Sequence, residues 1–272
     1  MNPEALISST NNPQIKNLAL LQRKAKARRE QGLFVVEGIK MLKEAKESGL
    51  LVKVYMSESF YQEKAKDEKL LLSQEYEIVT NAVLKQVSDT MTPQGIVGTI
   101  KIPEYSLDRI LEDKSPFLLL LEDIRDPGNL GTIIRTAEGA GVTGIIMNGS
   151  CADILQPKVV RATMGSIYRV PYYESCDFID ILSKLKSRGF SLFAAHLSGL
   201  SYDTRGSFIG KCGLLIGNEA AGLSDEATAM ADKLIKIPME GKVESLNAAV
   251  AAAILMYEAA RQRRTKPHFT DQ

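Results

Sequence analysis

The chain has 272 residues, of which 44% are hydrophobic and 25% are charged, and its formal net charge is +1. These are the proportions of a globular protein with ample material for a core, and they exclude a chain too polar to fold. Because the net charge is close to zero, it identifies no partner, and any electrostatic argument must rest on local clusters of charge.

The first hundred residues alternate helix-like and strand-like segments, which predicts a small α/β unit. Helices are predicted at 12–32 with a stop at Gly32, at 39–49, at 59–70, and at 81–89 with Asn81 as N-cap. Strands are predicted at 33–38, 51–57, 76–80 and 95–101. Residues 102–116 hold two prolines and six charges, which predicts a linker with one helical turn.

The second half begins with the unbroken apolar run 117–122, which is suited to the buried middle of a parallel sheet. Further strands are predicted at 144–149, 168–173, 191–197, 212–217 and 232–238. Helices are predicted at 156–165, 177–189 and 245–264. The simplest architecture is two α/β domains, 1–105 and 116–272, joined by the linker 106–115.

Gly139, Gly141 and Gly144 have the spacing G-x-G-x-x-G of a dinucleotide-binding fingerprint. That fingerprint must follow a strand and open a helix, so that the pyrophosphate meets free N–H groups. Here the glycines follow the helix-like segment 129–141 and lead into a strand, where a helix exit favours positive φ. The order of elements therefore disfavours an NAD(P)- or flavin-dependent oxidoreductase.

Three other stretches carry candidate chemistry. The first is a strand-to-helix turn that holds Asn129 and Arg135, at a place where a ligand could bind. The plainer alternative is that Asn129 caps the helix and that Arg135 lies on its solvent face. The second, 214–227, is a loop of small residues that permits close backbone approach to a ligand, or an ordinary loop with Ser224 as a cap. The third, 237–264, runs into an alanine-rich helix, with Ser245 or Asn247 as its N-cap.

In this order and spacing, the three stretches resemble the motifs of the SpoU (TrmH-like) RNA 2′-O-ribose methyltransferases of the SPOUT superfamily. The resemblance runs from Phe117 to Arg264 through DPGNLGTIIRTAEGAG, LLIGNEAAGLS and IPMEGKVESLNAAVAAAILMYE. The N-terminal part, best at LFVVEGIKMLKEA, resembles the family's substrate-binding domain. The resemblance implies a SPOUT-type α/β domain with a deep trefoil knot, preceded by a small α/β substrate-binding domain of ribosomal-protein-like fold.

The resemblance also implies a cofactor and a set of site residues. S-adenosylmethionine would lie in the knotted loops, lined by Gly217, Glu219, Ile237, Met239 and Leu246. The family's catalytic positions fall on Asn129, Arg135, Ser245 and Asn247. The family is dimeric, with the active site near the subunit interface, so we expect a homodimer. No metal is expected.

Arg135 is the residue that the family would cast as the base. A guanidinium has a pKa above about 12 and stays protonated, so this role is chemically awkward. We favour Arg135 as a bidentate phosphate ligand that stabilises the developing alkoxide, and the alternative of a base remains open.

Basic residues gather in two places. Arg23, Lys24, Lys26, Arg28 and Arg29 lie on the first predicted helix, and Arg261, Arg263, Arg264 and Lys266 lie near the C-terminus. We expect the first cluster to contact RNA phosphates, although a basic run is also compatible with a solvated face. The chain has two histidines: His196, at a strand end, is structural or faces the cofactor, and His268 lies in the tail.

Three cysteines, Cys151, Cys176 and Cys212, are far apart and outside any C-x-x-C pair, which favours reduced thiols in a cytosolic protein. No apolar run approaches the roughly 20 residues needed to cross a bilayer, so no membrane association is expected. We therefore expect a cytoplasmic, S-adenosylmethionine-dependent RNA 2′-O-methyltransferase acting on ribosomal RNA of the 23S type. Transfer RNA as substrate, and a non-catalytic RNA-binding or ribosome-assembly protein of the same fold, are the alternatives.

Overall fold

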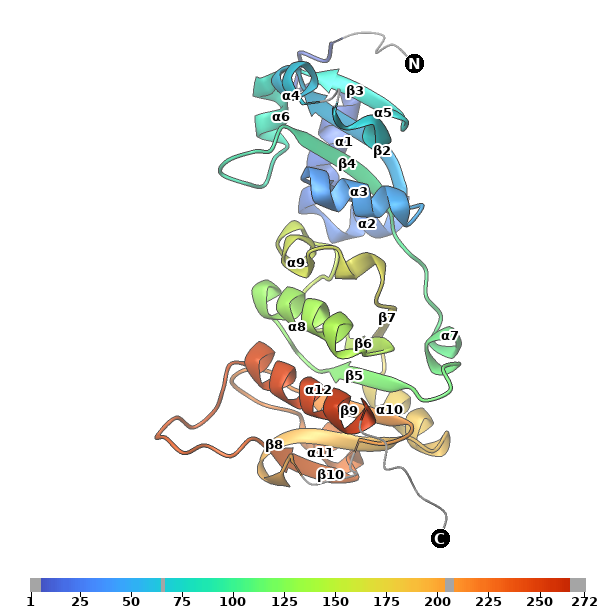
Figure 1. Cartoon of the computed structure of the whole chain (residues 1–272), viewed down its shortest axis with the longest axis vertical. Coiled ribbons are helices and arrows are strands. Elements are labelled where there is room, and N and C mark those ends of the chain that lie inside the picture. The colour runs from blue at the N-terminus through green and yellow to red at the C-terminus, as the bar shows by residue number, and fades with distance from the viewer. Residues whose placement is uncertain (1–5, 65–66, 204–207, 265–272) are drawn as a thin grey trace. The chain divides into compact units, whose positions relative to one another are not determined.

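The computed structural model describes residues 6–64, 67–203 and 208–264 (Figure 1). The chain divides into two compact units. Unit 1 contains Met1–Glu104 together with Asp153–Tyr168, and unit 2 contains Tyr105–Ala152 and Arg169–Gln272. None of the helices in the described ranges is both long and apolar enough to cross a membrane.

Unit 1 is built on a four-stranded sheet in the order β1-β4-β2-β3. The strands are β1 (Leu33–Glu37), β2 (Leu51–Ser57), β3 (Tyr76–Val79) and β4 (Ile96–Lys101). Strand β4 runs antiparallel to β1 and β2, and β2 runs parallel to β3. Apolar residues of the first helix, including Ile15, Leu18 and Leu21, form a core cluster with Val35 and Val97 of the sheet.

The described helices of unit 1 are short. They are α1 (Pro13–Arg23), α2 (Ala25–Gln31), α3 (Ile39–Glu47), α4 (Glu58–Glu63), α5 (Lys69–Leu72), α6 (Asn81–Gln86) and α9 (Pro157–Thr163), with the 3₁₀ turn η2 (Ser166–Tyr168). Helix α6 is capped by Thr80, whose hydroxyl accepts from the Val83 amide, so the prediction of Asn81 as its cap was wrong.

The single helix predicted over 12–32 is also wrong, because the backbone is extended at Lys24 (φ −121°, ψ 109°). Arg28 supplies the physical reason. Its guanidinium donates to the carbonyls of Leu21 at 2.5 Å and Gln22 at 3.0 Å, which a continuous helix would use for its own amides. A buried side chain thus caps α1, and the chain starts α2 in a new direction.

Unit 2 is built on a six-stranded parallel sheet in the order β10-β8-β9-β5-β6-β7. The strands are β5 (Phe117–Leu121), β6 (Gly144–Asn148), β7 (Tyr172–Ser175), β8 (Ser191–Ser201), β9 (Cys212–Ile216) and β10 (Lys233–Lys236). All five residues of β5 are fully buried, as its apolar run predicted. Strand β9 lies between β5 and β8, although it follows both in the chain.

The described helices of unit 2 are α7 (Leu107–Leu111), α8 (Pro127–Ala140), α10 (Phe178–Ser187), α11 (Asp225–Met230) and α12 (Ala248–Arg264). Helix α8 ends at Gly141, which has a φ of 77°. The glycines of the G-x-G-x-x-G pattern therefore lie at a helix exit, as predicted, and open no dinucleotide site. Helix α12 packs against α8 and β9.

The segment 153–168 follows β6 in the chain but packs within unit 1. Arg28 forms an ion pair with Asp153, and Arg161 contacts Asp89 at 2.5 Å. Rings of Phe34 and Tyr168 lie 6.4 Å apart. The sequence pattern placed this segment with residues 116–272, because a contact between distant parts of a chain leaves no periodic signal.

Candidate functional site

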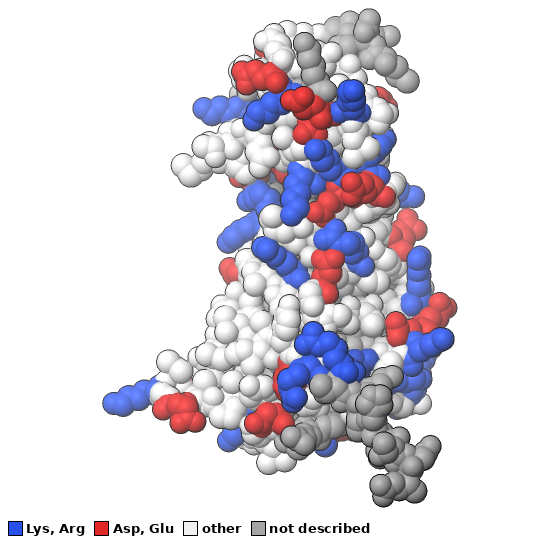
Figure 2. All heavy atoms as spheres, viewed as in Figure 1, with Lys and Arg blue, Asp and Glu red and all other residues white. Residues whose placement is uncertain are grey.

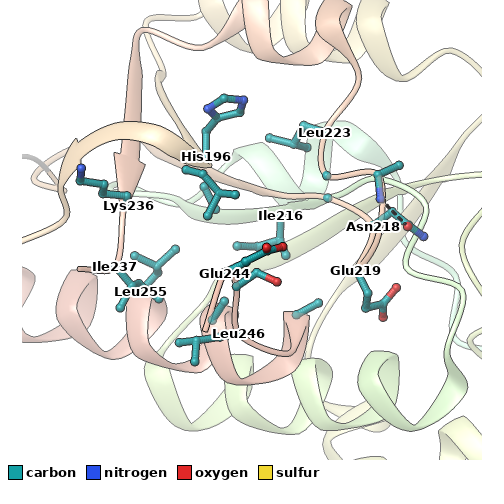
Figure 3. Close-up of a pocket in the computed structure, with 18 of the residues that line it drawn as sticks. His196, Ile216, Asn218, Glu219, Leu223, Lys236, Ile237, Glu244, Leu246 and Leu255 are labelled. Atoms are coloured by element: carbon teal, nitrogen blue, oxygen red, sulfur yellow. Dashed lines mark hydrogen bonds between the residues drawn. The ribbon is translucent and has the colours of Figure 1, made fainter. Parts of the chain in front are cut away.

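Unit 2 contains a cavity of about 370 Å³ where the second half of β8 and the loops after β9 and β10 meet the start of α12 (Figure 3). The carboxyl ends of parallel strands are the usual place for a ligand in an open α/β sheet. Figure 3 shows Ile237, Leu246 and Leu255 on one side of the cavity and Asn218 and Glu219 on the other. All five residues predicted to bind the cofactor line it: Gly217, Glu219, Ile237, Met239 and Leu246.

The loop after β9 needs glycine at its first position. A Cβ on Gly217 would lie 2.3 Å from the carbonyl carbon of Gly222, which no real side chain tolerates. Asn218 then holds the turn, since its Oδ1 accepts from the amides of Ala220 at 2.9 Å and Ala221 at 3.1 Å. The small residues noted in the sequence therefore close a tight turn whose backbone forms a wall of the cavity.

Two acidic residues that directly follow β5 hold this loop in place through hydrogen bonds. Sequence reasoning did not identify them as functional. The Glu122 carboxylate accepts from the amide of Ser224 at 2.8 Å and its hydroxyl at 2.7 Å. The Asp123 carbonyl accepts from the Asn218 side chain at 2.9 Å. The pair of consecutive carboxylates directly after a buried strand was the available signal.

Asp123 is held in an unusual backbone conformation, with a φ of 57°. Its carboxylate accepts from the Asn148 amide at 2.7 Å and from Arg125 at 2.7 Å. The hydrogen bond from Asn148 is the main cause that lowers the pKa of Asp123, with Arg125 adding to it against a smaller opposing effect of burial. Asp123 therefore stays ionised near neutral pH, and the two hydrogen bonds to its carboxylate hold the residue whose carbonyl accepts from Asn218.

A chain of side-chain hydrogen bonds joins the three motifs. The Asn247 Nδ2 donates to the Asn129 Oδ1 at 3.0 Å, and the Asn129 Nδ2 donates to the Glu219 carboxylate at 2.6 Å. Asn129 does not cap α8, because Asp126 accepts the Asn129 backbone amide at 2.8 Å. Three residues predicted from separate motifs thus form one hydrogen-bonded unit beside the cavity.

The start of α12 places the third-motif residues. The Asn247 Oδ1 accepts from the amides of Ala249 at 2.9 Å and Val250 at 3.3 Å, so Asn247 rather than Ser245 caps the helix. Ser245 lines the cavity instead. His196 also lines the cavity, with its Nδ1 2.8 Å from the Ser198 hydroxyl. His268 lies outside the described residues.

Arg135 is not brought to these residues within one chain. It lies on α8 with its side chain exposed, and that side chain makes no hydrogen bond or ion pair with another residue of the described ranges. It is six residues beyond Asn129, which in an α-helix is about 9 Å along the axis and on a different face. The structure therefore groups Asn129, Ser245 and Asn247 around the cavity and leaves Arg135 apart from it.

The basic residues of the first helical region divide into two kinds. Arg23, Lys24, Lys26 and Arg29 are exposed. Arg28 is only 3% exposed and is paired with Asp153, so it does not belong to the exposed cluster in which the sequence placed it. A polar side chain at that depth needs partners inside the fold, and sequence position alone could not reveal them.

The C-terminal basic residues also differ in role. Arg263 donates to the carbonyls of Phe208 at 3.0 Å and Gly210 at 2.7 Å, and Arg261 is bound to Glu258 at 2.7 Å. Lys266 lies outside the described residues. No cluster of three or more His, Cys, Asp or Glu side chains suited to a metal ion is found in the part of the chain that the structure describes.

Comparisons with known proteins agree with this arrangement. The model of the SpoU rRNA Methylase family matches residues 116–257, and that of the MRM3-like substrate binding domain matches residues 12–98. The chain is 32% identical to an uncharacterized tRNA/rRNA methyltransferase of Synechocystis sp., covering 95% of this chain and 94% of that protein. It is 31% identical to the 23S rRNA (guanosine(2553)-2′-O)-methyltransferase RlmP of Bacillus subtilis, covering 92% and 97%.

A solved structure is similar over nearly the whole chain. The SpoU methyltransferase AviRb of Streptomyces viridochromogenes, in complex with the cofactor AdoMet, has a TM-score of 0.83 and 29% identity, covering 94% of this chain and 100% of that one. The family and the fold class predicted from the three motifs are thereby confirmed. The chain belongs to the SpoU rRNA methylase family.

Proposed function

We propose that this protein transfers a methyl group from S-adenosylmethionine to the 2′-hydroxyl of a ribose in ribosomal RNA. The observation that carries the proposal is the chain of side-chain hydrogen bonds Asn247–Asn129–Glu219, which joins all three motifs beside one cavity. The printed names of the relatives support the substrate, since the Bacillus subtilis protein is a 23S rRNA 2′-O-methyltransferase. No observation favours transfer RNA or a non-catalytic role over this reaction.

The cavity fits S-adenosylmethionine in size and chemistry. Its volume of about 370 Å³ lies within the roughly 300–1,000 Å³ of small-molecule sites. Main-chain groups of the tight turn at Gly217 face apolar side chains of Ile237 and Leu246, which suits a ligand with a polar edge and an apolar ring. When bound, S-adenosylmethionine supplies an electrophilic methyl group.

The chain's own residues then orient the acceptor. Glu219 fixes the Asn129 amide through its 2.6 Å hydrogen bond, and Asn129 in turn fixes Asn247. Amides locked in this way can hold a ribose hydroxyl at one position, and positioning alone supplies a large share of the acceleration in a group transfer. We assign Ser245, which lines the same cavity, to the same task.

We assign the fourth catalytic role to Arg135 of a second copy of the chain. Arg135 would bind a phosphate of the RNA and stabilise the alkoxide as the ribose proton leaves. A homodimer formed through α8 and α12 brings the arginine of one protomer near the cavity of its partner. On that face Val250 and Tyr257 are each 48% exposed, and Figure 2 shows a mostly uncharged surface over the first turns of α12, with Lys and Arg side chains gathered at its C-terminal end.

RNA contact is assigned to the exposed residues Arg23, Lys24, Lys26 and Arg29 of unit 1. Phosphate contacts of this kind make affinity fall steeply with salt. We place the reaction in the cytoplasm, because the three cysteines are free thiols, which is typical of a reducing compartment.

The test is methyl transfer in vitro. S-adenosylmethionine with a radioactive methyl group is incubated with the protein and with ribosomal RNA from cells that lack the gene. The proposal predicts label in an alkali-resistant dinucleotide, because a 2′-O-methyl group blocks cleavage at that ribose. Label on a base, or label in transfer RNA alone, would contradict it.

A further inference from the structure

A second cavity of about 370 Å³ lies within unit 1, far along the chain from the methyl-donor loops. Three segments form its walls: the break between α1 and α2, the turn after α6, and the start of the segment 153–168. We call it the polar cavity. We propose that it binds one unpaired nucleotide of the RNA substrate and reads the identity of its base; this inference rests on the proposed function.

The walls of the polar cavity are fixed by hydrogen bonds. The Gln22 side chain donates to the Val87 carbonyl at 2.5 Å, which holds the turn after α6 against α1. The same turn is held from its other side by Glu37, which accepts from the hydroxyls of Ser88 at 2.6 Å and Thr90 at 2.7 Å. A site built this rigidly binds a ligand at low cost in conformational entropy.

The third wall is anchored by Arg28. Its ion pair with Asp153 holds the segment 153–158 in place, and the Leu155 amide donates to the same carboxylate at 3.0 Å. Arg28 lines the polar cavity, and only 3% of its surface is exposed. Its Nε has no hydrogen-bond partner among the described atoms. A buried, unpartnered donor is costly, so it indicates an acceptor supplied by a ligand.

The charge of the cavity favours an anionic ligand. Both carboxylates that line it are paired, Asp153 with Arg28 and Asp89 with Arg161. The cations Arg23 and Lys158 line it, are exposed, and make no ion pair with another described residue. Two free positive charges at the rim suit the phosphates on either side of one nucleotide.

The remaining lining groups suit a base. The side-chain amides of Gln86 and Gln156 each offer a donor and an acceptor, as the edge of a base requires. Ala25 and Pro157 present apolar surface for its faces. Sequence-specific recognition of RNA mostly uses bases that are unpaired and turned out of a helix.

The experiment measures binding of fluorescein-labelled RNA pentanucleotides to the full-length protein. The probes are the four homopolymers, a DNA pentanucleotide, a 12-base-pair RNA duplex and the free nucleoside monophosphates. We expect one homopolymer to bind roughly tenfold more tightly than the others, with the same base preference among the monophosphates. Gln156→Ala should remove the preference, and Lys158→Ala should weaken all RNA probes roughly tenfold.

Lys85→Ala is the matched control, because Lys85 is an exposed lysine on α6 that does not line the polar cavity. Equal weakening by Lys85→Ala and Lys158→Ala, an unchanged preference in Gln156→Ala, or no binding of any pentanucleotide would overturn the inference. Calorimetry with S-adenosylmethionine on the same samples separates the two claims. Normal cofactor binding with unselective RNA binding removes the inference alone, whereas absent cofactor binding removes the proposed function.

Discussion

The Asn247 side chain donates a hydrogen bond to the Asn129 Oδ1 at 3.0 Å, across 118 residues of sequence. This contact joins the cap of α12 to the first turn of α8, and Glu219 extends it to the loop after β9 at 2.6 Å. The contact ties the residues that orient the ribose to the loop that forms the methyl-donor cavity.

Asn129→Ala removes both hydrogen bonds while leaving the Asp126 cap in place. We expect kcat to fall roughly 100-fold, because a positioning group that acts in the transition state is lost. Steady-state methylation assays measure this loss. Asn17→Ala, at an asparagine of unit 1 that pairs with Gln31, is the control and should keep wild-type turnover. Wild-type kcat in Asn129→Ala would remove this residue from the mechanism.

Gly217→Ala tests the tight turn. Its Cβ would meet the Gly222 carbonyl carbon at 2.3 Å, so the backbone that lines the cavity must move. We expect the affinity for S-adenosylmethionine, measured by calorimetry, to fall at least roughly tenfold, with a loss of stability of about 1–3 kcal/mol. Gly149→Ala is the matched control, since a Cβ there meets open space at an ordinary φ. Equal cofactor affinity in the two variants would contradict the assignment.

Much of the fold was predictable from local signals. The buried strand β5, the glycine exit of α8 and the Ser224 cap of α11 all follow from periodicity and capping rules, because each is set by neighbours in sequence. The three long motifs also pointed to the cavity-lining residues. The strand order, with β9 inserted between β5 and β8, left no local signal.

Apart from the cap of α6, which is shifted by one residue from Asn81 to Thr80, the errors have one physical cause, which is contact between distant segments. Lys24 breaks the first helix because Arg28 reaches back to the end of α1 and across to Asp153. Asn129 does not cap α8 because its side chain is hydrogen-bonded to Glu219 and Asn247.

Arg135 is tested by mixing two inactive variants. Arg135→Ala and Asn247→Ala are each expected to lose most activity. If Arg135 serves the cavity of the partner, a mixed dimer holds one intact site, so the mixture should recover methylation after subunit exchange. If both residues acted within one chain, every site in the mixed dimer would be defective. No recovery, although mixed dimers form by native mass spectrometry, would contradict the dimeric site.

Substitutions at Arg28 and at Lys24 should affect different properties, the first the stability of the protein and the second its binding of RNA. Arg28→Ala leaves Asp153 without its partner and the end of α1 without its cap, so the free energy of unfolding should fall by about 3–5 kcal/mol. Lys24→Ala, at an exposed position, should change the free energy of unfolding by less than about 0.5 kcal/mol. It should instead weaken RNA binding and reduce the dependence of the RNA affinity on salt. Urea denaturation and RNA titrations at several salt concentrations measure the two effects, and equal destabilisation by both variants would refute the division.

Burial raises the pKa of Cys151 and of Cys212 to about 11 each, against opposing hydrogen bonds or the charge of Arg263. Both thiols therefore stay protonated and unreactive near neutral pH, while Cys176 is exposed. We expect iodoacetamide at pH 8 to modify Cys176 alone, as read by mass spectrometry, and Cys176→Ser to abolish labelling.

The raised pKa values of Cys151 and Cys212 make the stability of the fold depend on pH. The folded state binds these two protons more tightly than the unfolded chain, so their contribution to stability is present below about pH 9 and is lost as the pH rises toward about 11. Rapid alkylation of Cys151 or Cys212 in the folded protein at pH 8 would show that the burial of these thiols is not maintained.

The central claim is that the protein methylates a ribose of ribosomal RNA at the site where the three motifs meet. It is tested most directly by mapping ribose methylation across total RNA from cells with the gene, without it, and without it but carrying the wild type or Asn247→Ala. The account predicts that one 2′-O-methyl group in ribosomal RNA disappears with the gene, returns with the wild type and does not return with Asn247→Ala. Identical ribose maps with and without the gene would contradict it.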